Sequence, residues 1–582
     1  MKSIKFLLGA FCAIGMIACS NSDDVDDGGG TTPDGTSQNL YLSVNVMAAN
    51  EGTRATYMNG DPNEAQYEKG EGDENKVENA VFYFFYEDGS PANVVKNANA
   101  ADGYVNYYES PVVDGSTDDM PNVEKILTST VVINTKKGDR VPDKIVAILN
   151  LNVNDYKSQS INDLSKIVKD FRLNETTTSF VMSSSVYSDG GVKMMAVDNI
   201  KDYFDTNQAV AEANPVDIYV ERVLAKVSVG TKMTANLDNL EKDNETLYYT
   251  GQTIDKSDDV NQRVYVKFLG WNIATETESS YLFKNINPAW TKDDLGITSW
   301  TWPDFHRSFW AMNPNGVEYD NYSFDKATLK IGSVDANGNV VYGTKTDTED
   351  NRNYTYVQEN ASPYKEDGTA TALKENATKV LVAAQLVDKN GAVINLAEWR
   401  GLRSNEAGVL KNMANFSGIY YQDPEDVTKR HKITPEMIEF TDGDKYAYAV
   451  LTETAKTNTF YLSSTATEAT TPDLVNASLK DKLGEAKVWK GGNTYYYTDI
   501  RHLGKITPAV GETPEVVSVG AYGVVRNHSY QVVINSVTGL GTPVYKPEDV
   551  IIPDTPDEEE SYLAARIKVL SWRVVKSTVD LK

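Results

Sequence analysis

Few residues of this chain have the type and spacing that catalysis or metal binding requires. The four histidines, His306, His431, His502 and His528, form no His-x-x-x-His or Glu-x-x-His pair. The sequence has no Gly-x-Ser-x-Gly or Gly-x-x-x-x-Gly-Lys motif and no cysteine nucleophile. Residues 335–339 resemble the start of a calcium loop, but Thr346 stands where the final glutamate belongs. We therefore expect no catalytic residue, metal or cofactor, although a glycosidase-type carboxylate pair would leave no local signature.

The N-terminus carries the pattern of a lipoprotein leader. Lys2 and Lys5 precede an apolar run from Phe6 to Ile17, and the segment ends Ala18-Cys19. This predicts cleavage before Cys19 and lipidation of its thiol. A transmembrane anchor is the alternative, but the run is shorter than the ~20 residues that a span needs. Cys12 leaves with the leader, so the exported chain has no thiol for a disulfide.

Two further groups of residues invite a functional interpretation. Arg54 is the first arginine of the chain, and it lies in a polar, glycine-containing loop that offers an arginine-specific protease one isolated site, although most loop arginines are merely solvated. Aromatic residues gather at Trp300, Trp302, Phe305 and Trp310. They are suited to stacking against a carbohydrate, but burial in a core is the commoner fate of such residues.

Composition favours an all-β protein of more than one domain. At 582 residues the chain is too long for one core. It contains 34 Tyr and 16 Phe among many Asp-Gly and Asn-Gly pairs, which favours strands and tight turns. A formal charge of −27 excludes nucleic acid as a natural partner, because phosphate binding needs clustered Lys and Arg.

Alternating apolar residues predict the strands that form the body. The first, residues 39–47, places Leu40, Leu42, Val44 and Val46 on one face. Later strands are predicted at 76–86, 130–135, 144–151, 264–273 and 524–537, with a hairpin over 378–399 that turns at Asn390-Gly391. Residues 161–171 have helical spacing. The apolar alternation of residues 216–229 changes phase at Glu221 and Arg222, which predicts a bulge. The polar segment 236–259 suggests a domain boundary.

The C-terminus repeats the alternation behind a stiff spacer. Residues 547–560 are rich in Pro, Asp and Glu, which opposes packing against the body. The tail, 561–582, then places Leu563, Ala565, Ile567 and Val569 on one face, and the apolar set shifts to Leu570, Trp572 and Val574. Such a strand needs a sheet to join, which can belong to another molecule.

With these segments in view, the chain resembles the shaft subunits of Bacteroidales (type V) fimbriae, in particular the major subunit of the minor fimbria. The resemblance rests on the leader ending at Cys19, Thr53-Arg54-Ala55 and the motifs VERVLAKVSV and FLGWNIATETESSYLF. It rests further on VVRNHSYQVVINSVTGLG, the acidic spacer and the terminal IKVLSWRVVKSTVDL, the last two being the most specific.

The resemblance implies two transthyretin-like β-sandwich domains in tandem, followed by an extended C-terminal donor strand. The expected divisions are a signal peptide (1–19), a tether with a removable strand (20–54), two sandwiches (55–240 and 241–546), the linker (547–560) and the donor strand (561–582). An arginine-specific protease would cut between Arg54 and Ala55 and so remove Leu40, Leu42, Val44 and Val46. The exposed groove would accept the tail of a neighbour. Such a head-to-tail contact does not close, and it builds a filament.

The resemblance also implies partners and a location. The partners are other copies of the chain, accessory, tip and anchor fimbrial subunits, and the outer membrane through the lipid before cleavage. The product is a cell-surface fimbrium that supports adhesion, colonisation and virulence, and the chain is not an enzyme. Two other functions remain open: a tip or accessory adhesin of the same system, and a monomeric surface lipoprotein that binds glycans through Trp300 and Trp302.

Overall fold

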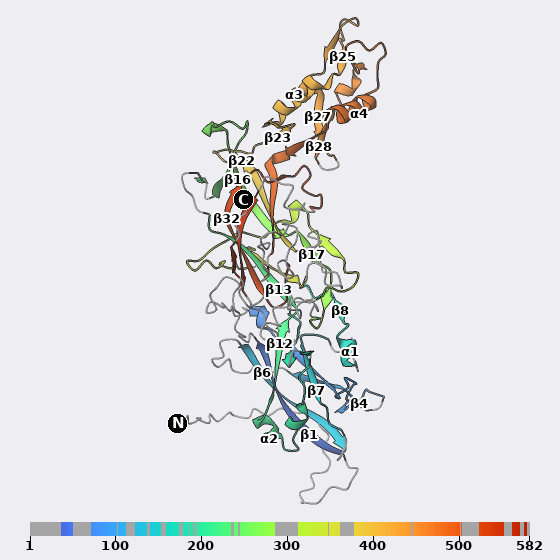
Figure 1. Ribbon diagram of the computed structural model, residues 1–582, viewed down its shortest axis with the longest axis vertical. Coiled ribbons are helices and arrows are strands. Elements are labelled where there is room, and N and C mark those ends of the chain that lie inside the picture. The colour runs from blue at the N-terminus through green and yellow to red at the C-terminus, as the bar shows by residue number, and fades with distance from the viewer. Residues whose placement is uncertain are drawn as a thin grey trace, which may run out of the picture.

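The computed structural model describes most of the chain between Ser37 and Thr578. Outside the description lie 1–36, 50–71, 112–122, 286–311, 361–377, 503–522, 552–561, 571–575, 579–582 and the shorter stretches 102, 137–139, 153–158, 174–178, 186, 190–191, 195, 234–237, 243–244, 347–348, 444–445 and 501. The described residues form an elongated body of two β lobes, with a smaller module beyond the second lobe (Figure 1).

The first lobe is built on one seven-stranded sheet. Its order is β5 (Tyr107–Pro111), β2 (Asn79–Phe85), β7 (Lys144–Leu149), β9 (Met182–Ser184), β12 (Val216–Arg222), β1 (Ser37–Ala49) and β6 (Val123–Lys136). The sheet curls around one apolar core, and the two edge strands approach each other where Ser110 Oγ and Ser129 Oγ lie 2.5 Å apart. Phe82, Phe84 and Phe85 of β2 are fully buried in that core.

Short elements surround this sheet. They are η1 (Gly72–Asn75), β3 (Val95–Lys96), β4 (Tyr104–Val105), α1 (Ile161–Leu164), β8 (Val168–Lys169), β10 (Tyr187–Asp189), β11 (Val192–Met194), η3 (Ile200–Tyr203) and α2 (Gln208–Ala213). The helix predicted over 161–171 is wrong beyond Leu164. The capping box of Ser160 and Asp163 starts the helix, but Val168 and Lys169 pair as a strand with Tyr281 and Ser280.

The second lobe packs two six-stranded sheets around a shared core. One sheet runs β20 (Gly332–Ser333), β13 (Leu224–Thr231), β32 (Ser529–Thr538), β34 (Tyr562–Leu570) and β35 (Lys576–Thr578), with β21 (Tyr354–Gln358) also on β13. The other runs β14 (Leu240–Lys242), β15 (Glu245–Thr253), β16 (Arg263–Ile273), β22 (Lys379–Val387), β31 (Asn493–Asp499) and β33 (Thr542–Pro543). Beside them lie η4 (Val260–Gln262), β17 (Thr275–Thr277), β18 (Ser280–Tyr281), β19 (Tyr319–Asn321), η7 (Phe324–Lys326) and η11 (Lys490–Gly492).

The phase change at Glu221 and Arg222 is a change of sheet and not the predicted bulge. β12 ends at Arg222 in the first sheet, and β13 begins at Leu224 in the second lobe. Each strand buries its own apolar set, and Val223 between them is fully buried. The passage between lobes therefore lies at Val223, whereas the sequence suggested a domain boundary in the polar segment 236–259.

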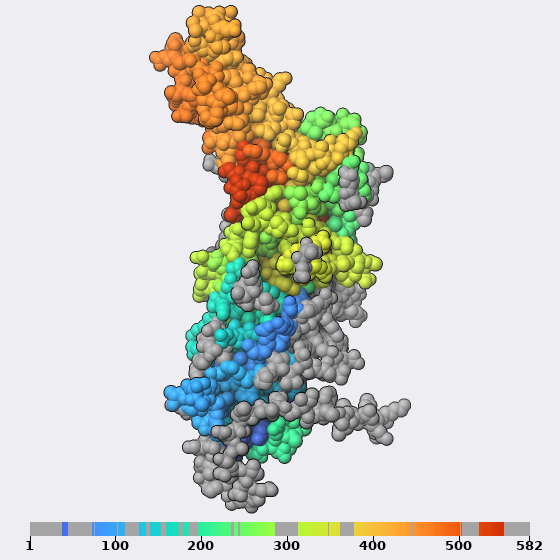
Figure 2. All heavy atoms as spheres, turned by 180° about the vertical axis from the view of Figure 1, so that it is seen from behind, coloured from blue at the N-terminus to red at the C-terminus, as the bar shows by residue number. Residues whose placement is uncertain are grey.

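A module with its own apolar core is inserted in the second lobe between β22 and β31. Its sheet runs β24 (Leu402–Asn405), β23 (Leu396–Trp399), β30 (Glu485–Trp489), β28 (Ala447–Leu451) and β27 (Ile438–Thr441), and a smaller one runs β26 (Arg430–Lys432), β25 (Tyr420–Gln422) and β29 (Phe460–Tyr461). α3 (Glu406–Ser417), α4 (Pro472–Leu483), η9 (Pro435–Met437) and η10 (Ala455–Thr457) complete it. The module stands at one end of the molecule in both views (Figures 1 and 2).

The module explains why the predicted hairpin over 378–399 is only partly right. The turn at Asn390-Gly391 forms, with Gly391 at φ 81° and Ile394 N donating to Leu386 O at 3.0 Å. From Leu396 onward, however, the chain pairs with β24 and β30 and leaves the lobe. The predicted all-β class, with β-sandwich lobes in tandem, is confirmed. Within the described residues, no helix is long and apolar enough to span a membrane.

Candidate functional site

Strand β1 lies in the interior of the first sheet. It pairs antiparallel with β6 along its whole length and parallel with β12 from Val44 to Ala48. On the edge of β1 opposite β6, Tyr41 exchanges two backbone hydrogen bonds with Asp205, of 2.8 and 3.0 Å. A strand held on both sides leaves two rows of unpaired backbone groups if it is removed.

The predicted apolar face of β1 points into the core. Leu42 and Val44 are fully buried, and Leu40 is 7% exposed. Val46 pairs with Ile218 and Leu127 through its backbone, and its side chain lies outside the described part. Three of the four residues predicted for the removable strand therefore line the core of the first lobe, so losing this strand would open an apolar groove.

The opposite face of β1 is covered as well. Ser43 is fully buried, and its Oγ has no hydrogen-bond partner among the described residues. Helix α2 packs against β1, and Thr130, the cross-strand partner of Ser43, donates from Oγ1 to Glu212 of this helix at 3.0 Å. The site of Ser43 thus accepts only a small side chain.

The C-terminal tail pairs with the second lobe of its own chain. β34 runs antiparallel to β32 from Ser529, opposite Leu570, to Thr538, opposite Tyr562. The predicted donor residues Leu563, Ala565, Ile567, Val569 and Leu570 all belong to β34, and β35 folds back on it. The tail is therefore a strand, as predicted, and it has a partner within the molecule.

Several predicted residues lie outside the described part of the chain. These are the lipidation site Cys19, the cleavage site Arg54 and Ala55, the tail residues Trp572 and Val574, and the aromatic residues Trp300, Trp302, Phe305 and Trp310. In the sequence, Arg54 nevertheless stands between the described strand β1, which ends at Ala49, and the described helix η1, which begins at Gly72.

A buried polar cluster, which sequence reasoning missed, forms around η1. Glu74 of η1 accepts a hydrogen bond from Tyr356 and forms an ion pair with Lys226 at 2.8 Å. Its backbone oxygen accepts from Arg222 Nε at 2.8 Å. Burial and the Glu74 carboxylate raise the pKa of the Tyr356 hydroxyl. Glu74 thus ties η1 to β13 and β21 of the second lobe, which no local pattern could reveal.

Of two more buried ion pairs, one lies within the second lobe and the other joins the lobes. Arg526 Nε lies 2.7 Å from Glu359, and its other nitrogens donate to the backbone oxygens of Leu282 and Tyr281. Lys284 lies 3.5 Å from Glu221 of β12, and desolvation lowers its pKa. All four of these side chains are at most 3% exposed. Removing one member of such a pair leaves an uncompensated buried charge, which is strongly destabilising.

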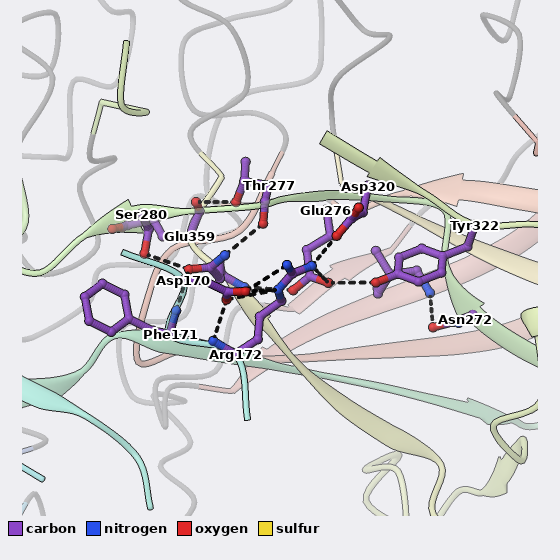
Figure 3. Close-up of polar contacts among 12 residues, drawn as sticks. Asp170, Phe171, Arg172, Asn272, Glu276, Thr277, Ser280, Asp320, Tyr322 and Glu359 are labelled. Carbon is purple, nitrogen blue, oxygen red and sulfur yellow. Dashed lines mark hydrogen bonds and ion pairs between the residues drawn. The ribbon is translucent and has the colours of Figure 1, made fainter. Parts of the chain in front are cut away.

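Arg172 forms a third bridge between the lobes (Figure 3). It follows β8 and contacts Asp170 at 2.9 Å, Asp320 of β19 and Glu276 of β17 at 3.9 Å. Glu276 is buried, and desolvation raises the pKa of its carboxyl to about 7 despite the opposing effect of Arg172. Tyr322 donates to this carboxylate at 3.3 Å, and burial raises its own pKa to about 12.

These contacts are suited to holding lobes together, and the described residues contain no cluster of three or more His, Cys, Asp or Glu that could hold a metal ion. The features with a functional geometry are therefore the interior strand β1 and the tail β34. Strand β1 occupies a place that could accept another strand, and the tail β34 has the alternation of apolar and polar residues that suits an incoming strand.

Comparison with known proteins gives one family match. Residues 487–578 match the family described as major fimbrial subunit protein type IV, fimbrillin, C-terminal. The match includes β31, β32 and the tail strands β34 and β35. The resemblance to fimbrial subunits is thereby confirmed for residues 487–578. No curated protein matches the sequence.

Solved structures give more distant matches. A fimbrilin from Porphyromonas gingivalis is 14% identical, with 92% of this chain and 98% of that chain covered and a TM-score of 0.34. A tip fimbrial protein from the same organism is 12% identical, with 92% and 100% covered and a TM-score of 0.28. A fimbrial assembly protein from Parabacteroides distasonis is 10% identical, with 73% and 99% covered and a TM-score of 0.28.

Proposed function

We propose that this protein is a structural shaft subunit of a cell-surface fimbria that polymerises by strand exchange. It is exported as an outer-membrane lipoprotein anchored through Cys19. An arginine-specific protease cuts after Arg54 and releases the lipid, the tether and β1. The C-terminal tail of a second copy then fills the groove, and accessory, tip and anchor subunits complete a fimbrium that supports adhesion.

One observation carries this proposal: β1 is an interior strand whose loss would open a groove with two hydrogen-bonding walls and an apolar floor. Each buried backbone N–H or C=O that is left without a hydrogen bond in such a groove destabilises the protein by about 1–3 kcal/mol. A peptide strand satisfies these groups. The same chain ends in an alternating strand inside the segment that matches the fimbrillin family.

The apolar residues of the tail provide the second part of the driving force. Burial of Leu563, Ile567 and Val569 contributes roughly 1.5–3 kcal/mol for each side chain before ordering costs are subtracted. Donor and acceptor surfaces lie on different lobes, so one contact leaves the next donor and the next acceptor available. Repetition therefore gives an open filament.

Electron microscopy of cleaved protein tests this function. A lipid-free chain of residues 20–582 is treated with an arginine-specific protease, and mass spectrometry confirms an N-terminus at Ala55. We expect filaments from this sample only. Arg54→Gln, which is not cut at this site, and a chain lacking residues 562–582 are the matched controls and should remain monomeric. Cleaved protein that keeps its tail and stays monomeric would falsify the proposal.

A further inference from the structure

Strand β1 and the C-terminal tail share an order of residue types. Each has Tyr, Leu, a small residue, an aliphatic residue, a polar residue and an aliphatic residue in succession. The two segments are Tyr41-Leu42-Ser43-Val44-Asn45-Val46 and Tyr562-Leu563-Ala564-Ala565-Arg566-Ile567. The shared order runs in the same chain direction in both, so a tail that follows it would lie parallel to β12 and antiparallel to β6, as β1 does.

The small residue is the informative one. Ser43 is fully buried on the face that α2 covers, opposite Thr130. Tyr41, the neighbour that precedes Ser43 on this face, is less restricted, since it carries an aromatic ring and is half-buried. The groove therefore imposes a size limit at one position, and the tail has a methyl side chain, Ala564, at the matching place.

We propose that Ala564 of one copy occupies the site of Ser43 in its neighbour, and this inference rests on the strand exchange proposed above. Tyr562 then replaces Tyr41, Leu563 replaces Leu42, and Ala565 and Ile567 replace Val44 and Val46. Tyr562 has the backbone N–H and C=O needed for the two hydrogen bonds that Asp205 makes with Tyr41. In this register, the small side chain of Ala564 determines which alignment of the tail the groove accepts.

A register shifted by two residues is the competing arrangement. It would place Leu563 at Leu40 and so match the apolar face over its full length. It would also place Arg566 at the fully buried site of Ser43, beside Thr130, which already donates to Glu212. The proposed register instead places Ser561 at Leu40, which is 7% exposed. Losing one apolar contact costs less than burying an arginine without a partner.

Cross-linking between copies distinguishes the registers, because residues directly opposite on antiparallel strands have Cβ atoms about 4.5–5.5 Å apart. The lipid-free chain of residues 20–582 contains no cysteine, so introduced thiols react alone. Chains with Thr130→Cys are mixed with chains carrying either Ala564→Cys or Arg566→Cys, cleaved, assembled and treated with a short thiol cross-linker. We expect covalent dimers with Ala564→Cys and a large loss of product with Arg566→Cys.

Two controls separate the possible failures. Uncut Ser43→Cys with Thr130→Cys in one chain should cross-link internally, which shows that position 130 reacts. Filaments of the unmodified chain show that strand exchange itself occurs. If filaments form but cross-link through Arg566→Cys, or through neither introduced donor cysteine, the proposed register is wrong. The formation of filaments would still support strand exchange. If the cleaved, unmodified chain gives no filaments, the proposed function fails and the register falls with it.

A size test adds independent evidence. Ala564→Phe should abolish filaments in the proposed register, since no aromatic ring fits the site of Ser43. In the shifted register the same residue takes the place of Tyr41, where an aromatic ring is already accommodated, so normal filaments would contradict the proposal. Circular dichroism of the uncut variant checks that it folds.

Discussion

Glu74 and Lys226 form an ion pair of 2.8 Å across the two lobes, and both side chains are at most 5% exposed. The Lys226 ammonium also lies 3.8 Å from the centre of the Tyr342 ring. Glu74 stands at the start of the described chain after the loop that carries Arg54. The pair therefore anchors η1, which follows Arg54 in the sequence and stays with the protein if Arg54 is cut.

The ion pair predicts a large loss of stability when Glu74 is removed. Glu74→Ala leaves the Lys226 charge buried, and breaking such a pair costs about 3–5 kcal/mol. The urea midpoint of unfolding, measured by fluorescence, should fall. Glu78→Ala is the matched control, since Glu78 pairs with Lys76 at 2.7 Å on the surface, where both side chains are about half exposed. Equal effects of the two substitutions would contradict a structural role for Glu74.

Glu276 predicts a pH dependence of stability. Its pKa rises from 4.5 to about 7 in the folded protein, so its stabilising contribution is complete below pH 4.5 and is lost as the pH rises through 7. The shift corresponds to roughly 3 kcal/mol at most. Glu276→Gln stays neutral and should therefore gain stability relative to the unmodified protein between pH 5 and pH 8. Urea midpoints at both pH values measure this gain.

The control for this experiment is Glu468→Gln, a substitution at an exposed position of the inserted module. Its stability relative to the unmodified protein should not depend on pH over the same range. If Glu276→Gln behaves in the same way, the raised pKa of the Glu276 carboxyl does not govern stability between pH 5 and pH 8, and the assignment is wrong.

The inserted module should be dispensable for assembly. Its first and last strands pair with each other, and Glu398 lies opposite Lys487. Joining these two residues through an Asn-Gly turn, which is typical of two-residue hairpins, removes the module and keeps its base. The shortened chain should fold, and after cleavage it should form filaments of the same length distribution in electron micrographs. A folded but non-assembling product would show that the module contributes to the contact.

Hydrogen exchange should report the pairing of the tail. β32 is bonded to β13 on one side and to β34 on the other. Deleting residues 562–582 from the uncut chain should therefore speed the exchange of those β32 amides that face β34. Amides in the β16 and β22 pair serve as the internal control and should not change. Unchanged exchange in β32 would mean that the tail is not paired there in solution.

The sequence predicts those features that depend on local patterns. The alternation of residues 39–47 identifies β1 and its buried face, and the Asn390-Gly391 turn forms as predicted. The two long helices of the module are not among the predicted elements, although they carry local signals: Asn405 and Thr471 cap them, and Val475, Leu479 and Leu483 are buried at helical spacing. The position of β1 between β12 and β6, and the burial of Glu74, depend on contacts between distant segments, which no single-sequence pattern encodes.

The pairing of β34 with β32 within one chain has a consequence for the kinetics of growth. A tail tethered beside its own lobe competes with any neighbour at an effective concentration in the millimolar range for short linkers. When a subunit joins a fibre, its tail loses its backbone hydrogen bonds with β32 and forms new ones in the groove of a neighbour. Growth is driven only by the difference in free energy between these two pairings. Subunits held this way should show a lag phase and a critical concentration, and each fibre should be polar, with an empty groove at one end and a self-paired tail at the other.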